Sequence, residues 1–139
     1  MAITPNASGN DLALDVAGGS TADGAGLIQW YGHFGGNQRF DLVDQGDGTG
    51  TIVNQNSGKC LTTDGVAGHA SYQSTSNGSP LQQWSGTLRQ AFDGATTPAN
   101  QFTGLRMDIE GGSAWAGARL VGWYPNGGKN QLFRYFQLF

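Results

Sequence analysis

Hydrophobic and polar residues alternate along short stretches of the chain, and glycine-rich segments separate these stretches. Leu12, Leu14 and Val16 recur with a period of two, which is the spacing of a β-strand with one buried face. A turn is expected directly afterwards, at Gly18 and Gly19. Further strands are predicted at 27–31, 38–43 and 51–53, with a loop at 44–50. The pattern therefore predicts an all-β chain of short strands.

The first part of the chain is repeated near its end. Residues 12–42 align without a gap with residues 105–135, and 14 of the 31 paired positions are identical. The identities include an aspartate, a Gly-Gly-Ser turn, a Trp-Tyr pair and an Asn-Gln pair. A match of this extent indicates an internal structural repeat.

A weaker copy lies between these two segments, from about residue 51 to residue 88. Three Gln-x-aromatic triplets mark the three copies, and they begin at Gln38, Gln82 and Gln131. The chain is thus predicted to be one domain of three repeats, at roughly 1–49, 50–95 and 96–139, with about four strands each. A propeller with three blades is not expected, because propellers usually have about four to eight blades. Three four-stranded units around a pseudo-threefold axis predict a β-trefoil instead.

The composition agrees with a turn-rich β fold and excludes some partners. The 139 residues include 24 glycines, and nine of the ten acidic residues are aspartate, which favours turns. Only 12% of the residues are charged, and the net charge is −3. No Lys/Arg cluster is present, so no nucleic acid is expected as a partner. No apolar run approaches the ~20 residues of a membrane span.

Cysteine content and the N-terminal segment bear on localisation. Cys60 is the only cysteine, so the chain cannot form an internal disulfide. The first residues, MAITPNASGN, contain neither a basic leader nor an apolar segment, so no signal peptide is expected. Both observations predict a cytoplasmic protein, which could also be released by a leaderless route.

Catalytic and metal-binding groups are not expected. One cysteine and two histidines, His33 and His69, cannot form a usual zinc site, and no phosphate-binding loop or other cofactor motif is found. Asp108 and Glu110 lie two residues apart and could resemble a glycosidase pair. Glu110 aligns with Ala17 in the other copy, however, so the pair is not part of the repeat, and the chain is not expected to be an enzyme.

The repeated motifs resemble those of the ricin B-type (R-type) lectins, also called carbohydrate-binding module family 13. The resemblance covers nearly the whole chain. It rests on the segments 14–25 (LDVAGGSTADGA) and 57–61 (SGKCL) and on the three Gln-x-aromatic triplets. It implies a β-trefoil that binds sugars, commonly terminal galactose or N-acetylgalactosamine, in shallow pockets, with at most one pocket per repeat.

A sugar offers hydroxyl groups at its edge and an apolar C–H surface on one face, so its site needs hydrogen-bonding side chains and an aromatic platform. In the first repeat the resemblance assigns Asp15 as hydroxyl acceptor, Gln29 as rim residue, Tyr31 as platform, Asn37 as hydroxyl partner and Gln38 as the support of Asp15. In the third repeat the corresponding residues are Asp108, Tyr124, Asn130 and Gln131, and Gly122 replaces the rim glutamine.

The second repeat departs from this pattern. Thr62, Ser76 and Leu81 are expected at the positions of the aspartate, the platform and the asparagine. All three recognition roles are therefore lost together, and this repeat is predicted to bind no sugar.

Several alternatives remain open. Asp15 and Asp108 could be turn residues that face the Gly-Gly pairs. Trp30 and Trp123 are expected in the core, but a register shifted by one residue would make them the platforms and place the neighbouring tyrosines in the core. The apolar last strand, 131–139, is expected to close the barrel, although one of its faces could serve a homodimer.

The function predicted from the sequence is a lectin that binds galactose-type glycans through two sites. One alternative is a xylan- or arabinan-binding module of a glycoside hydrolase. The other is a non-sugar β-trefoil, such as a protease inhibitor, which would have no reason to keep the Asp, Tyr and Asn positions twice.

Overall fold

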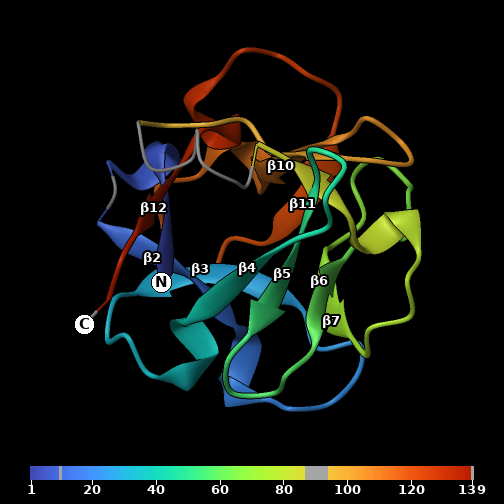
Figure 1. Ribbon diagram of the computed structural model, residues 1–139. Coiled ribbons are helices and arrows are strands. Elements are labelled where there is room, and N and C mark those ends of the chain that lie inside the picture. Colours follow the sequence, from blue (N-terminus) through green and yellow to red (C-terminus); the bar gives the residue numbers. More distant parts are fainter. Residues whose placement is uncertain (10, 87–93, 139) are drawn as a thin grey trace.

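The computed structural model describes residues 1–9, 11–86 and 94–138. Within these residues the chain forms twelve short β-strands, joined by turns and single-turn 3-10 helices (Figure 1). The first strands are β1 (Ala2–Pro5), β2 (Leu12–Val16), β3 (Leu27–Tyr31) and β4 (Phe40–Asp44). The middle strands are β5 (Gly50–Asn54), β6 (Cys60–Thr62), β7 (Tyr72–Ser74) and β8 (Trp84–Ser85). The last strands are β9 (Ala99–Asn100), β10 (Arg106–Ile109), β11 (Leu120–Trp123) and β12 (Phe133–Phe136). The 3-10 helices cover Asn6–Ser8, Ala17–Gly19, Gly36–Gln38, Pro80–Gln82, Glu110–Gly112 and Lys129–Gln131.

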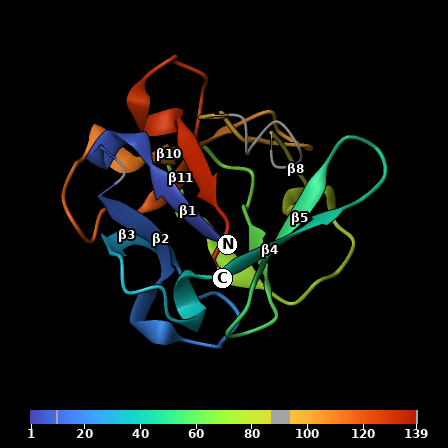
Figure 2. The same ribbon diagram turned by 60° about the vertical axis from the view of Figure 1, so that its left-hand side comes forward.

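Six of the strands close into a barrel. β1 pairs with β12, β4 with β5, β5 with β8, and β8 with β9, all antiparallel. The Phe40 N–H donates to the Met1 carbonyl over 2.8 Å, which joins the start of β4 to the residue before β1. Thr96 and Phe133 exchange two backbone hydrogen bonds, of 2.8 and 2.9 Å, which join the segment before β9 to β12. The ring is therefore complete, and the first and last strands lie side by side (Figure 2).

The other six strands pair as three hairpins, β2–β3, β6–β7 and β10–β11. Isolated bridges connect the hairpins to one another: Gly26 with Tyr72, Ile28 with Arg119, and Ala70 with Val121. Each hairpin thus contacts both others. A six-stranded barrel with three mutually connected hairpins is a β-trefoil, so the predicted fold class is correct.

The strands agree closely with the hydrophobic pattern, with two differences. β2 and β3 occupy the predicted ranges, whereas β4 begins two residues later than predicted because Gln38 belongs to a 3-10 helix. All five residues of β2 are buried, although the period of two predicted one exposed face. The side chain of Gln38 accounts for part of this burial, because it lies against Asp15 on the second face of β2.

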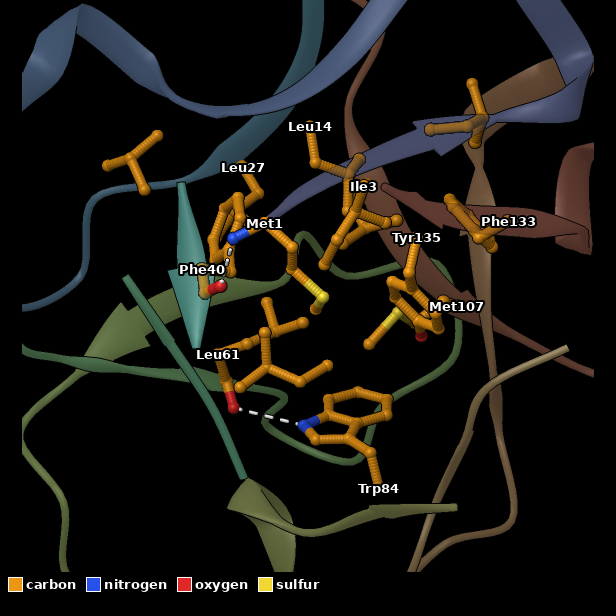
Figure 3. Close-up of a cluster of buried hydrophobic side chains, with 14 residues drawn as sticks. Met1, Ile3, Leu14, Leu27, Phe40, Leu61, Trp84, Met107, Phe133 and Tyr135 are labelled. Atoms are coloured by element: carbon orange, nitrogen blue, oxygen red, sulfur yellow. Dashed lines mark hydrogen bonds between the residues drawn. The ribbon is translucent and has the colours of Figure 1, made fainter. Parts of the chain in front are cut away.

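Apolar side chains from all three repeats form one core (Figure 3). Phe40, Trp84 and Phe133, the aromatic residues of the three triplets, are at most 1% exposed, and burying side chains of this size contributes about 3 kcal/mol each. The Trp84 indole N–H also donates to the Leu61 carbonyl at 3.1 Å. Because each aromatic ring is fixed in the core, the glutamine two residues before it is held at a fixed place beneath its hairpin.

The last strand closes the barrel as expected. Phe133 and Tyr135 point inward and are buried, whereas Arg134 and Phe136 are exposed. The last residue of the predicted range, Phe139, lies outside the described residues. Self-association through this strand stays a prediction.

Two further observations concern the described ranges alone. They contain no helix that is long and apolar enough to cross a membrane. In the same ranges, no three His, Cys, Asp or Glu side chains gather closely enough to hold a metal ion.

Candidate functional site

A buried glutamine in the first repeat organises the polar groups beneath the β2–β3 hairpin. Gln38 donates from Nε2 to Asp15 Oδ2 and to the Tyr31 carbonyl, both at 2.8 Å. Its Oε1 accepts from the backbone N–H groups of His33 and Phe34, at 2.9 and 3.0 Å. All four hydrogen-bonding positions of the amide are therefore used. The bond to Asp15 fixes its carboxylate, so the predicted support of Asp15 by Gln38 is present.

Gln131 makes equivalent contacts in the third repeat, with one backbone N–H in place of two. Its Nε2 donates to Asp108 Oδ2 at 2.9 Å and to the Tyr124 carbonyl at 2.8 Å, and its Oε1 accepts from the Asn126 N–H at 3.0 Å. Burial raises the pKa of Asp108 above its ordinary value, and the hydrogen bonds from Gln131 and Asn130 oppose this rise. Asp108 is thus a carboxylate of fixed orientation in a partly desolvated place.

Strand pairing decides which aromatic residue lies beside each aspartate. Asp15 pairs with Ile28, so Trp30, two residues further along β3, lies on the same face of the hairpin. Tyr31 pairs with Leu12 and lies on the opposite face. In agreement with this, Trp30 lines the hollow above Asp15, and Tyr31 is not among its lining residues.

The third repeat has the same arrangement, with Trp123 beside Asp108. The expectation that the tryptophans are core residues is therefore wrong, and the structure places the tryptophans rather than the tyrosines beside the aspartates. Trp30 and Trp123 are 41% and 42% exposed. Tyr31 and Tyr124 are not in the core either, because both are more than 60% exposed and meet the tryptophans edge-on at 5.4 Å between ring centres.

Gln29 does not lie at the rim of a site, which corrects another expectation. It faces the core side of β3 and is fully buried. Its Nε2 donates to the carbonyls of Ser113 and Trp115, at 2.9 and 2.8 Å. Gln29 therefore holds a loop of the third repeat against the first repeat.

The first-repeat site is an open hollow of about 370 Å³ whose polar and aromatic residues are Asp15, Trp30, His33 and Asn37. His33 Nδ1 accepts the N–H of Gly35 at 2.9 Å, so the neutral ring carries its proton on Nε2. That Nε2 lies 3.7 Å from Asp15 Oδ2. The site thus combines a hydrogen-bond acceptor, two donors and an indole face.

The third-repeat site is a hollow of about 390 Å³ with Asp108, Trp123, Asn126 and Asn130 at the corresponding places. Asn126 Oδ1 accepts the N–H of Gly128 at 2.8 Å, the bond that His33 Nδ1 makes in the first repeat. Asn130 donates to Asp108 Oδ2 at 3.0 Å.

Glu110 also lines the third-repeat site. Its carboxylate accepts from both the Nε and the terminal nitrogen of Arg119, and this ion pair lowers the pKa of Glu110. The carboxylates of Asp108 and Glu110 therefore have different partners, a glutamine and an arginine.

A pair of glycines forms one wall of each site. Gly18 and Gly19 have φ angles of 66° and 63°, and Gly111 and Gly112 have φ angles of 69° and 63°. Two consecutive residues in this left-handed region strongly favour glycine. The Gly-Gly-Ser turn of the sequence repeat thus shapes the hollow itself.

The second repeat keeps the glutamine and loses the site. Gln82 donates to Thr62 Oγ1 at 3.2 Å and to the Thr75 carbonyl at 3.0 Å. Because the Thr75 carbonyl takes the place of the Tyr31 carbonyl, the counterpart of Trp30 is Ser74. Ser76 was expected at the position of the tyrosine, but Thr75 stands there.

The connection in the second hairpin is also shorter. Thr62 pairs with Tyr72, whereas Asp15 pairs with Ile28, so three fewer residues separate the paired positions. The 3-10 helix with the glycine pair is absent from this connection, all of whose residues the structure describes. A hollow of about 250 Å³ lies elsewhere, beside β4, β5 and β6, and neither Thr62 nor Ser74 is among its lining residues.

Sequence reasoning gave no role to His33 or Glu110, although both line a site. A signal for His33 existed, because it aligns with Asn126 and both side chains can accept a backbone N–H two residues ahead. Glu110 has no counterpart in the repeat, and only the folded chain brings it to the site.

Comparison with known proteins decides the family. A family model described as "Ricin-type beta-trefoil lectin domain-like" matches residues 2–84 and 36–123. The chain belongs to this family. The ricin-type domain is similar to the designed threefold-symmetric protein ThreeFoil, with 34% identity and a TM-score of 0.90 over 99% of this chain and 97% of that one.

Two natural proteins are also similar to this ricin-type domain. The exo-β-1,3-galactanase 1,3Gal43A from Clostridium thermocellum is 31% identical, with a TM-score of 0.86 over 96% of this chain and 29% of the enzyme. The C-half of an earthworm R-type lectin, in complex with GalNAc, has the same fold, with 24% identity and a TM-score of 0.73 over 95% of this chain and 93% of that one. No curated protein matches the sequence significantly.

Proposed function

We propose that this ricin-type domain binds terminal galactose or N-acetylgalactosamine residues through the first-repeat and third-repeat sites. One observation carries the proposal: the same arrangement occurs twice in the chain. In each site a buried glutamine fixes an aspartate, and an asparagine and an exposed tryptophan line the same hollow.

The chemistry of the arrangement suits a sugar. The carboxylates of Asp15 and Asp108 accept hydrogen bonds from sugar hydroxyl groups, and the asparagine amides can both donate and accept. The indole faces of Trp30 and Trp123 can cover the apolar C–H surface of a pyranose ring. Binding of this kind is reversible and involves no bond breaking.

Two sites on one rigid domain matter when the target carries many glycans. Each open, hydrogen-bonded site is expected to be weak alone, and simultaneous binding raises the affinity by about 10²-fold if the spacing fits. The proposed partners are therefore multivalent glycans of glycoproteins, glycolipids or polysaccharides.

The comparisons support a galactose-type ligand. The earthworm lectin structure contains GalNAc, and the Clostridium enzyme is a β-1,3-galactanase. Calorimetric titration with galactose, N-acetylgalactosamine and xylose tests the proposal, and a stoichiometry near two for the galactose-type sugars is expected. Binding of no sugar at all would overturn it.

Single variants test which residues form the sites. Asp15→Ala and Asp108→Ala are each expected to reduce the stoichiometry to one, with an unchanged circular dichroism spectrum. Thr62→Ala is the matched control in the second repeat. A loss of sugar binding in Thr62→Ala would show that the second repeat is not inactive.

A second candidate function is a polysaccharide-binding module of a glycoside hydrolase. The 31% identity to a segment that makes up 29% of the galactanase favours it. This function predicts tighter binding to β-1,3-galactan, xylan or arabinan oligosaccharides than to the monosaccharides. The third-repeat site alone, measured in the Asp15→Ala variant, separates the two functions. Equal affinity there for monosaccharides and longer chains would favour a lectin for terminal residues.

A further inference from the structure

A loop in each repeat is hydrogen-bonded to the hairpin of a neighbouring repeat. The backbone bonds that hold the three loops are equivalent: Gly117 N–H to Gln29 O (2.7 Å), Gly24 N–H to Gln73 O (2.8 Å) and Gly68 N–H to Gly122 O (2.8 Å). In each loop the residue after the glycine donates its N–H to the carbonyl of the residue two positions before the glycine, which closes a turn. These outer residues are Trp115, Ala22 and Val66.

The three outer residues differ greatly in size. Trp115 is 82% exposed, although its backbone is fixed at both ends by hydrogen bonds to Ser113 Oγ and Gln29 Nε2. The equivalent positions hold the smaller side chains of Val66 and Ala22. A tryptophan that stays in solvent on a rigid loop adds little to the stability of the fold and is available to a ligand.

Trp115 lies beside the first-repeat site. Gly117, two residues further on, packs against the tryptophan of that site, because a Cβ atom on Gly117 would lie 3.9 Å from Trp30 Cζ3. Two residues span at most about 7 Å of chain, so the Trp115 backbone is close to the edge of the first-repeat site. The exposed ring of Trp115 is therefore carried by a segment that borders the first-repeat site on the side of Trp30.

The third-repeat site is bordered by the equivalent loop of the second repeat, which has a smaller outer residue. Gly68 packs against Trp123 in the same way, with a distance of 3.6 Å from a Cβ atom to Trp123 Cζ3. The outer residue of that loop is Val66, which offers no aromatic face. The two sites thus share their inner part and differ at this edge.

We propose that Trp115 forms an extended subsite of the first-repeat site, which stacks on the second sugar of a galactose-terminated oligosaccharide. This inference rests on the proposed function, because the terminal residue occupies the hollow above Asp15. The first-repeat site then prefers disaccharides to monosaccharides, and the third-repeat site does not.

The test measures the first-repeat site alone, in an Asp108→Ala variant. Affinities for methyl β-galactoside, lactose and β-1,3-galactobiose are determined by calorimetry with and without Trp115→Ala. The substitution is expected to weaken binding of at least one disaccharide about three- to tenfold, the size of an aromatic stacking contribution, and to change the monosaccharide affinity less than about twofold.

Two further variants use the equivalent loops. Val66→Trp, in an Asp15→Ala background, is expected to give the third-repeat site the same preference for a disaccharide. Ala22→Trp is the matched control, because its loop borders the repeat without a site, and no change in affinity is expected.

The outcomes separate the two proposals. If Trp115→Ala weakens no disaccharide, or weakens the monosaccharide equally, the subsite is overturned while the lectin function stands. If the Asp108→Ala and Asp15→Ala variants both fail to bind any galactoside, the proposed function itself is overturned.

Discussion

The second and third repeats have the same buried framework and different surfaces above it. Gln82 and Gln131 each donate to a β-strand side chain and to a backbone carbonyl, and each accepts a backbone N–H. The strand side chain is the hydroxyl of Thr62 in the second repeat and the carboxylate of Asp108 in the third. The glutamine is therefore needed by the fold, since it remains where the site has gone.

The connection above the framework decides whether a hollow can form. In the third repeat Gly111 and Gly112 carry the chain around the hollow in a left-handed turn. The second repeat is three residues shorter at this point, and Leu81 replaces Asn130. The hollows beside Asp15 and Asp108 thus coincide with the longer connection, and the second repeat has neither.

Removal of the supporting glutamine should have the largest effect. Gln131→Ala leaves two backbone groups without a partner and leaves Asn130 as the remaining donor to the buried carboxylate of Asp108. We expect it to lower the free energy of unfolding by about 3 kcal/mol. Gln82→Ala should cost about 2 kcal/mol, because Thr62 is uncharged. Urea denaturation measures both. An equal or larger loss for Gln82→Ala would contradict the special role of the carboxylate.

Exchange of the aromatic residues tests the strand register. Trp123→Ala should weaken sugar binding at the third-repeat site by about tenfold, since it removes a stacking face of roughly 1.5 kcal/mol. Tyr124→Ala is the matched control and should change the affinity less than about twofold. Calorimetry in the Asp15→Ala background gives both values, and the reverse order would restore the tyrosine as the platform.

Acid should weaken the third-repeat site. Because burial raises the pKa of Asp108 above 3.8, the carboxylate takes up its proton at a higher pH than an exposed aspartate does. A neutral carboxyl is a poorer acceptor, so sugar affinity falls as the pH falls through the folded-state pKa, by up to about tenfold per pH unit. Titration of the Asp15→Ala variant measures this change.

The stability effect of the same group has the opposite sign. A raised pKa means that the Asp108 contribution to stability is present below the unfolded-state pKa and is lost as the pH rises through the folded-state pKa. Protonation of Asp108 in acid therefore favours the folded state, so the loss of binding does not come from unfolding through this residue, and circular dichroism at each pH provides the control. An affinity that does not change with pH would contradict Asp108 as the acceptor.

The smallest effect is expected from restoring the recognition residues alone. A variant with Thr62→Asp, Ser74→Trp and Leu81→Asn should show no third binding site, because the connection from residue 62 to residue 72 lacks the glycine turn. Insertion of three residues that include Gly-Gly should then create measurable binding. Calorimetric stoichiometry distinguishes two sites from three, and a third site without the insertion would show that loop length is unimportant.

Local patterns predicted the fold because the fold is repetitive. The period of two in Leu12–Val16 and the turn glycines depend on neighbours in the sequence. The 14 identities between the first and third repeats are found by comparing the chain with itself, without a structure. The aspartates and the supporting glutamines recur at fixed positions of the repeat, and the resemblance to the ricin B-type lectins assigned their roles. Gln29 and the tryptophans were misassigned because the facing of a strand residue depends on which partner it pairs with.

The sequence by itself determined that this protein is a threefold β chain with two intact copies and one altered copy of the same motif. Hydrophobic spacing and repeated polar residues are local properties, so they can be read without a structure. Only the tertiary structure decided that Trp30 and Trp123 face the aspartates, that Gln29 holds a neighbouring loop, and that Trp115 lies next to a site about 85 residues away in the chain. Those relations come from strand register and from contacts between repeats, which closure of the barrel creates.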